Sequence, residues 1–217
     1  MRILSTVLLL AWILLSPKGV HAGSDPFAYF PMVPMEKDYA GLGNKIHVHE
    51  VVRPVSFPGV PQGLEIRRTI VYLDFPPKTI VSTYAFDPLS GAFSKRSSTS
   101  AFSNQVFEYN PPLTRLVLPF SKGKTWSGRD GQNKLSDRVW GKVRVTLPAG
   151  TFVCWVVRRK LTYDLISRRS KQILYDYYAR GIGFVGEGGW SATGRWHWSR
   201  QLLSYRMKPA GTGAPAR

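Results

Sequence analysis

The sequence is short of several kinds of residue, and each shortage narrows what the protein can be. Its 217 residues include one cysteine, Cys154, so no disulfide can form within the chain and the fold depends on packing. Aspartate and glutamate number 13 against 30 lysines and arginines, which leaves few acids for chemistry that needs two facing carboxylates. After residue 22 no apolar run approaches the roughly 20 residues of a membrane-spanning helix, and we expect none there.

One apolar run does occur, at the amino terminus. Arg2 precedes Ile3–Leu15, thirteen uncharged and largely apolar residues, and the tripeptide VHA follows at 20–22. An apolar core of this length with a small-residue ending is typical of a secretory signal peptide. We therefore expect residues 1–22 to be a signal peptide cleaved after Ala22, and the protein to be periplasmic or secreted. Because the residue directly after the cleavage site is Gly23 and not cysteine, lipoprotein acylation is not expected.

The charge balance predicts an anionic partner. The formal charge is +17, and removal of Arg2 and Lys18 with the signal peptide would leave +15. A chain this basic attracts anions. Outside the cytoplasm the abundant anions are lipid headgroups, glycolipids and acidic glycans, and we expect no specific nucleic acid. The alternative is that the charge serves only solubility.

Turn signals at short intervals and alternating apolar residues predict an all-β fold. Val, Ile, Tyr and Trp are frequent, and no long segment has the 3.6-residue period of an amphipathic helix. We expect one domain at residues 45–208, built as an antiparallel curved sheet that forms a half-barrel or open barrel. Residues 23–44 would lead into it, and residues 209–217 would be a disordered tail.

The clearest hairpin lies in the second half of the chain. It joins Arg138–Leu147 to Thr151–Tyr163 through residues 148–150 (Pro-Ala-Gly), in which Gly150 can adopt a positive φ. Arg195–Met207 is expected to be the last strand, although its centre could be helical.

Three segments are expected to interrupt the strands. Proline cannot donate to a β-ladder, so Pro76-Pro77 is predicted to form a turn and Pro111-Pro112 to break a strand. Ser121–Lys134, which is rich in Gly, Lys and Arg, is predicted to be a loop.

Three blocks of sequence resemble a known family in their order and spacing. They are Leu118–Trp126 (LPFSKGKTW), Gly141–Phe152 (GKVRVTLPAGTF) and Tyr177–Val185 (YYARGIGFV). Together they are similar to motifs of the TapB-like family of exported bacterial proteins, which is related to a larger domain family without assigned function. The resemblance covers roughly residues 115–190, and it departs at Arg180, where the family usually has proline.

The resemblance implies a secreted, β-rich domain with a curved sheet or open barrel. It implies no catalytic residues. The matching residues themselves have structural character, since Trp126 and Phe152 are large apolar plugs and Gly181 and Gly183 allow a bend or bulge in a strand.

Tryptophans and arginines near the carboxyl terminus form the best candidate ligand surface. Trp196 and Trp198 would share one face of the last strand, with Arg200 following on the same face. Aromatic rings stack on sugars or acyl chains, and cations at the rim bind phosphate or carboxylate. We therefore predict a ligand site formed by Trp190, Arg195, Trp196, Trp198 and Arg200. The alternative is that this row is an apolar core stripe.

Other reactive side chains are weaker candidates. His47 and His49 share a strand face, a spacing that metal sites use, but no third ligand is evident. Cys154 lies between Val153 and Trp155 in an apolar strand, which favours a buried structural thiol.

No cofactor is expected. Residues 181–186 match the pattern G-x-G-x-x-G of a dinucleotide-binding loop, but no helix is predicted after them. The serine-nucleophile signature G-x-S-x-G does not occur.

Three functions remain open. The leading expectation is a non-catalytic envelope protein that binds an anionic lipid, glycolipid or glycan through an aromatic-lined, basic-rimmed sheet, with peripheral membrane contact and an envelope protein as further partners. An exported hydrolase of envelope polymer would use Asp176, Glu187 or His197 as acids or bases. A structural subunit of an envelope or secretion assembly would pair through an exposed edge strand.

Overall fold

The computed structural model describes residues 26–101, 103, 105–131, 133–164 and 169–208, so the predicted signal peptide and the predicted tail lie outside it. A short 3-10 helix at Pro26–Tyr29 precedes twelve β-strands. The strands are β1 (Met35–Gly41), β2 (Ile46–Phe57), β3 (Val60–Tyr72), β4 (Phe75–Asp87), β5 (Ala92–Thr99), β6 (Val106–Val117), β7 (Thr125–Asp130), β8 (Asn133–Leu147), β9 (Gly150–Asp164), β10 (Arg169–Ala179), β11 (Gly183–Trp190) and β12 (Trp196–Met207). In these residues there is no helix long and apolar enough to cross a membrane.

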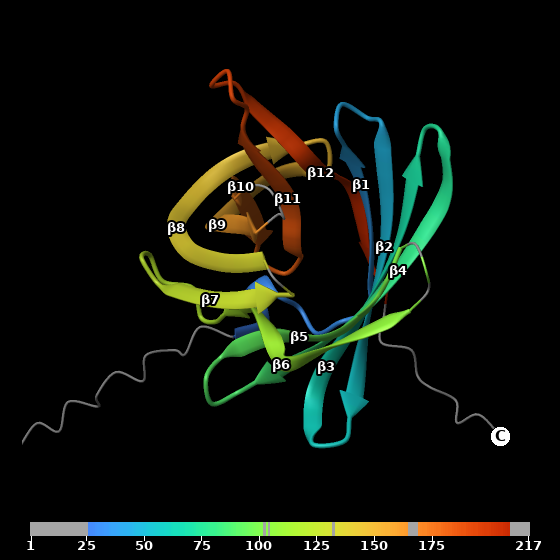
Figure 1. Cartoon of the computed structure of the whole chain (residues 1–217), viewed down its shortest axis with the longest axis vertical. Helices are drawn as coiled ribbons and strands as arrows, with labels where there is room; N and C mark the ends of the chain where they lie inside the picture. The colour runs from blue at the N-terminus through green and yellow to red at the C-terminus, as the bar shows by residue number, and fades with distance from the viewer. Residues whose placement is uncertain (1–25, 102, 104, 132, 165–168, 209–217) are drawn as a thin grey trace, which may run out of the picture.

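All twelve strands belong to one antiparallel sheet in the order β6-β5-β4-β3-β2-β1-β12-β11-β10-β9-β8-β7. The sheet curls until its two edge strands, β6 and β7, approach each other, and this gives a nearly closed barrel (Figure 1). At this seam a Cβ atom on Gly128 of β7 would come within 2.7 Å of Leu113 Cδ1 on β6, so the missing side chain lets the edges meet. The predicted all-β open barrel is confirmed.

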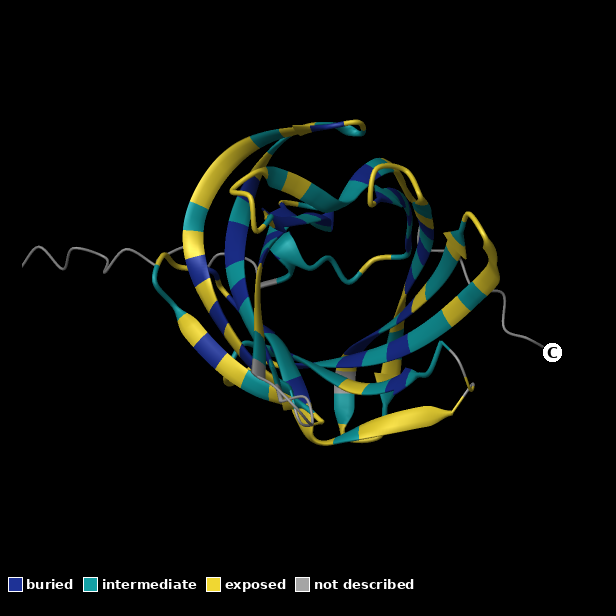
Figure 2. Cartoon of the chain, turned by 45° about the horizontal axis from the view of Figure 1, so that its top comes forward, coloured by how far each residue is buried: buried dark blue, intermediate teal, exposed yellow. Residues whose placement is uncertain are grey.

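Burial alternates along the strands, as expected for a sheet with one face inside (Figure 2). The segment before β1 packs its aromatic rings against the inner face of the barrel. Phe27 contacts Phe86 with ring centroids 4.8 Å apart, and Phe30 contacts Phe93 at 4.1 Å. These contacts build an apolar core beneath the polar site described below.

The lead-in segment is shorter than predicted, because Met35–Gly41 forms β1 in the middle of the sheet. This strand pairs with β2 on one side and with the last strand, β12, on the other. Its inner face presents Met35, Lys37 and Tyr39, all buried. Because the buried Lys37 interrupts the alternation of apolar residues, the sequence pattern does not predict this strand.

The two proline pairs do not end strands as predicted. Pro76-Pro77 lies inside β4 and Pro111-Pro112 inside β6. In both places the pairing with the neighbouring strand shifts register, so the prolines fall where regular ladder bonds are not needed. β6 is also an edge strand, which tolerates a missing N–H donor.

The hairpin and the final strand are confirmed, whereas the predicted loop at Ser121–Lys134 is wrong. β8 and β9 pair along their whole length, and β12 is a continuous strand without helix. β7 occupies Thr125–Asp130 within the predicted loop and pairs with β8. The sequence pattern does not predict β7, because Trp126 is its one large apolar residue and the others are small or polar.

Candidate functional site

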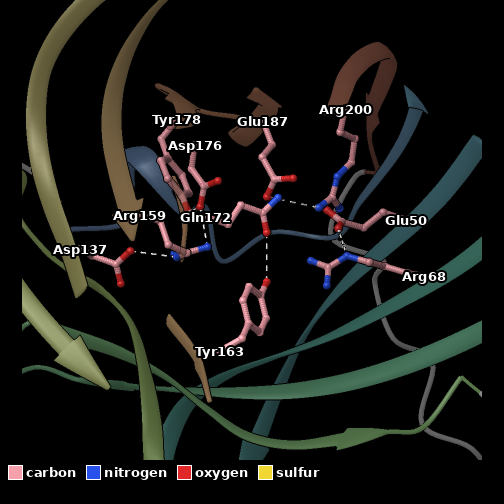
Figure 3. Close-up of polar contacts among 10 residues, drawn as sticks. All are labelled: Glu50, Arg68, Asp137, Arg159, Tyr163, Gln172, Asp176, Tyr178, Glu187 and Arg200. Atoms are coloured by element: carbon pink, nitrogen blue, oxygen red, sulfur yellow. Dashed lines mark hydrogen bonds and ion pairs between the residues drawn. The ribbon is translucent and has the colours of Figure 1, made fainter. Parts of the chain in front are cut away.

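Eight strands place an ion-paired charged side chain on the inner face of the barrel. We call this set the inner polar ring. Its members are Lys37 on β1, Glu50 on β2, Arg68 on β3, Asp137 on β8, Arg159 on β9, Asp176 on β10, Glu187 on β11 and Arg200 on β12. Figure 3 shows seven of them, all but Lys37, extending from opposite walls toward the interior.

One half of the ring is organised around Glu50. Its carboxylate is 2.7 Å from Arg68 Nε and 3.4 Å from Lys37 Nζ, and it accepts a hydrogen bond from the Tyr39 hydroxyl at 3.4 Å. Burial alone would raise the pKa of Glu50, but the charges of Arg68 and Lys37 outweigh it and lower the pKa to about 2. Glu50 is therefore a buried carboxylate that stays ionised.

The other half is organised around Arg159, which is only 3% exposed. Its Nε atom is 2.8 Å from Asp137 Oδ1, and its Nη1 atom is 2.7 Å from Asp176 Oδ2. Burial raises the pKa of Asp137, and the Asp176 carboxylate adds to this effect while Arg159 opposes it. The guanidinium of Arg159 thus forms ion pairs with two buried carboxylates.

This second cluster is incompletely satisfied. Arg159 Nη2, Asp176 Oδ1 and Asp137 Oδ2 are buried and have no hydrogen-bond partner among the described residues. Buried polar atoms are normally hydrogen-bonded, and unpaired ones are costly. A donor and acceptors held in this way can bind a polar group that enters the barrel.

Glu187 and Arg200 connect the two halves. Asp176 and Glu187 are direct cross-strand partners, and Glu187 is in turn paired with Arg200. Burial raises the pKa of Glu187, and the nearby Asp176 carboxylate raises it further. Arg200 lies 3.9 Å from Glu187 Oε2, and its guanidinium is 4.9 Å from the centre of the Phe184 ring.

The ring borders a cavity of about 100 Å³ with a basic excess. Its lining includes five basic side chains, Lys37, Arg68, Arg115, Arg159 and Arg200, and three acidic ones, Glu50, Asp176 and Glu187. Those acids are already paired with Arg68, Arg159 and Arg200, so Arg115 is left without an ion-pair partner in the described part of the chain.

The rest of the cavity wall is apolar. Its apolar lining includes Met35, Val52, Leu64, Ile66, Leu116 and Ile182. The cavity is therefore amphipathic, because both charged and aliphatic side chains line it.

The predicted ligand surface is divided between the two faces of the sheet. Opposite Glu187 and Gly188 the register of β12 shifts at Ser199, so Trp198 pairs with Gly188 and Arg200 pairs with Glu187. A bulge reverses the alternation of side chains. Arg200 consequently points into the barrel, whereas Trp198 lies on the outside against Tyr177. The prediction that these residues share a face is wrong.

The remaining predicted site residues lie away from the cavity. Trp190 and Arg195 are exposed, and Trp196 lies on the outer face with Trp198, at a ring distance of 5.7 Å. His197 is exposed and does not line the cavity.

The other candidate residues of the sequence, the two histidines of β2 and Cys154, also lie outside the cavity lining. His49 Nδ1 is 2.9 Å from Asp38 Oδ1, and His47 is exposed. Within the described residues no group of three or more His, Cys, Asp or Glu side chains is placed to hold a metal ion. Cys154 is buried as predicted, and burial raises the pKa of its thiol to about 12.

Sequence reasoning missed the inner polar ring, although one signal was present. In β2 the residues Val48, Glu50 and Val52 occupy alternate positions and are all buried. A charge at an apolar position of an alternating strand marks a buried ionic group. The same signal is present at Arg159, which follows Val157 on the inner face.

Comparisons with known proteins add little to this geometry. No family model matches the chain, and no curated protein matches it. The resemblance to the TapB-like family therefore stays a prediction.

Two solved structures are similar to the chain, each with a TM-score of 0.48. One is a Bacteroides fragilis protein assigned as exported and as having a YmcC-like fold, at 14% identity over 80% of this chain and 94% of that chain. The other is a Parabacteroides distasonis protein assigned as a lipoprotein, at 12% identity over 82% and 98%. Likeness at this level does not extend to function.

Proposed function

We propose that the protein is an exported, non-catalytic envelope protein that binds an anionic lipid or glycolipid, with the anionic group held in the central cavity. The observation that carries this proposal is the basic excess of a buried, amphipathic cavity whose acids are already paired. Arg115 offers a guanidinium without an ion-pair partner among the described residues, and Arg159 offers an unpaired N–H.

The electrostatics favour an anion. Five basic and three acidic side chains meet at the cavity, and burial beside the Asp176 carboxylate raises the pKa of Glu187 above its ordinary value. An arginine with free N–H groups binds phosphate or carboxylate through charge-assisted hydrogen bonds. The paired carboxylates of the ring would repel a second anion less than unpaired ones, because their charge is already compensated.

The aliphatic wall favours a ligand with an apolar part. A purely polar glycan would leave Leu64 and Ile66 facing hydroxyl groups, and burial of polar groups against apolar surface is unfavourable. The cavity of about 100 Å³ suits a compact anionic group with a short apolar stretch, which is the head region of an amphiphile.

A test uses dodecyl phosphate as the probe, with binding measured by calorimetry. Substitution Arg115→Gln is expected to weaken binding about 10-fold or more, because a hydrogen bond to a charged group contributes about 1.5–3 kcal/mol. Native mass spectrometry of the protein purified from the periplasm would show a bound amphiphile as an extra mass that is lost on denaturation.

Arg96→Gln is the matched control, because Arg96 is exposed on β5 next to Lys95. It is expected to bind dodecyl phosphate as the unsubstituted protein does. Equal affinity for dodecyl maltoside, which has no charge, would contradict the proposal, and so would unchanged binding by Arg115→Gln.

A hydrolase is a second candidate function, and one observation favours it. Asp176 and Glu187, which the sequence had suggested as acids, are direct cross-strand partners at the cavity, and the pKa of Glu187 is raised. A carboxylic acid of raised pKa can protonate a leaving oxygen while a second carboxylate assists the attack of water.

If the protein hydrolyses envelope polymer, Glu187→Gln should reduce the release of soluble fragments from purified peptidoglycan by about 100-fold. The folded fraction should stay unchanged by circular dichroism. His197→Gln is the control, because His197 lies outside the cavity. No release by the unsubstituted protein would remove this candidate.

A structural subunit remains a prediction. It would need a free edge strand, and the edges β6 and β7 approach each other at Leu113 and Gly128.

A further inference from the structure

Six aromatic side chains gather on the outside of the barrel, over strands β8 to β12. We call them the outer aromatic surface: Trp140, Tyr175, Tyr177, Trp190, Trp196 and Trp198. Trp196 connects the set, since its ring centroid is 5.4 Å from that of Trp190, 5.6 Å from Tyr175 and 5.7 Å from Trp198.

The local sequence explains why these rings lie outside. On β10, Asp176 and Tyr178 are buried toward the barrel interior, so Tyr175 and Tyr177 alternate outward. On β11, Gly186 and Gly188 leave room beside them, and a Cβ atom at Gly188 would come within 2.5 Å of the Trp196 ring. The rings of Trp196 and Trp198 on β12 thus pack over the glycines of β11.

Two indoles at the borders of this surface are largely uncovered. Trp140 is 55% exposed and Trp190 is 61% exposed, and the neighbouring Ile173 is 39% exposed. A contiguous exposed apolar patch on a folded protein commonly marks an interaction site. Tryptophan and tyrosine are the side chains enriched where an apolar medium meets water at a membrane interface.

Basic side chains border the aromatic rings on the same face. Arg138 on β8 pairs with Arg158 on β9, which pairs with Tyr175 on β10. In the next outward row, Lys160 on β9 is opposite Ile173. Cations and exposed aromatics are therefore cross-strand neighbours.

Acids are absent from this face, as far as the described side chains of β8 to β12 show. Asp137, Asp176 and Glu187 all belong to the inner polar ring. Across β8 to β12, the described acids therefore lie on the inner face, and the outer face carries Arg138, Arg158 and Lys160. An anionic lipid bilayer has a negatively charged surface above an apolar interior, and this aromatic and basic face is complementary to both.

We propose that the outer aromatic surface docks the protein on an anionic lipid bilayer. Trp140 and Trp190 enter the headgroup layer, and Arg138, Arg158 and Lys160 contact lipid phosphates. This surface lies on the opposite side of the sheet from the cavity, so the proposal does not depend on what the cavity binds.

The test is flotation of the protein with vesicles of phosphatidylethanolamine and phosphatidylglycerol, followed by tryptophan emission. The protein is expected to float with these vesicles, with a blue-shifted emission, and to remain unbound with phosphatidylcholine vesicles. Trp190→Ser is expected to weaken binding about 10-fold, because it removes a large apolar side chain from the contact. Arg158→Gln is expected to weaken it about fivefold and to reduce its salt dependence.

Two controls make the result specific. Phe107→Ser removes an exposed aromatic from β6, on another part of the barrel, and should leave vesicle binding unchanged. Arg115→Gln, the cavity variant, should also float normally, which separates this proposal from the proposed ligand. Absence of flotation would overturn the docking proposal, as would equal binding to neutral vesicles. Self-association that Trp190→Ser abolishes, without vesicle binding, would assign the surface to a second copy and overturn it too.

Discussion

Replacement of Arg159 by methionine is expected to lower the free energy of unfolding by about 3–5 kcal/mol. Arg159 holds Asp137 at 2.8 Å and Asp176 at 2.7 Å, and all three residues are at most 3% exposed. Methionine fills similar space, but it leaves two buried carboxylates without their cation. Urea unfolding followed by circular dichroism measures the loss.

The adjacent residue supplies the control. Arg158 directly precedes Arg159 on β9 and points to the outer face, where it is the cross-strand neighbour of Arg138. Arg158→Met should change the unfolding free energy by less than about 0.5 kcal/mol. Equal losses for the two variants would show that the buried cluster contributes nothing special to stability.

A third variant separates the cluster's charge from its packing. Arg159→Met combined with Asp137→Asn and Asp176→Asn removes the unpaired charges together. It is expected to recover most of the lost stability, because replacing a whole buried ionic cluster costs less than breaking one. Failure to recover would point to lost packing around Arg159.

Substitution Glu50→Gln is expected to reduce stability at neutral pH by about 3 kcal/mol and to remove part of its acid sensitivity. The folded-state pKa of Glu50 is about 2, below its ordinary value of 4.5. A depressed pKa stabilises the fold above the unfolded-state value. That stabilisation is lost as the pH falls from about 4.5 toward 2.

The measurement is unfolding free energy as a function of pH for both proteins. The difference between them should be largest above pH 4.5 and should shrink toward pH 2. The raised pKa values of Asp137 and Glu187 act in the opposite direction, but both proteins keep those groups, so subtraction isolates Glu50. Glu108→Gln, exposed on β6, should leave the unfolding free energy unchanged. A pH-independent difference would contradict the argument.

These two predictions bear on function because burying charged side chains inside a barrel carries a desolvation cost. An apolar interior of the same volume would be at least as stable. Here Glu50, Arg68, Arg159 and Asp176 instead line a cavity, and polar atoms of Arg159 and Asp176 have no hydrogen-bond partner among the described residues. Departures from a locally consistent core are expected where a protein binds or reacts.

The strand pattern could be derived from the sequence wherever it is local. The hairpin between β8 and β9 follows from alternating valines around Pro148 and Gly150, and the burial of Cys154 follows from its apolar neighbours. β1 and β7 could not be found in this way, since Lys37 and the short polar residues around Trp126 break the hydrophobic alternation.

The candidate site was largely beyond reach of the sequence. Asp176 and Glu187 were named as acids, but nothing in their spacing states that β10 and β11 place them opposite each other. Trp198 and Arg200 were assigned to one face because a regular strand requires it, and the extra residue Ser199 separates them. A bulge depends on how the neighbouring strand pairs, which is not a local property.

The sequence by itself determined the all-β class, the strong positive charge, the lack of disulfides and most strand positions, because these depend on composition and on the two-residue period of a strand. Only the tertiary structure decided which charges meet. Pairing of β8, β9 and β10 brings Asp137, Arg159 and Asp176 together inside and leaves Trp140 and Trp190 outside. The physical reason is that register and curvature, set by pairing between distant strands, select the face on which each side chain lies.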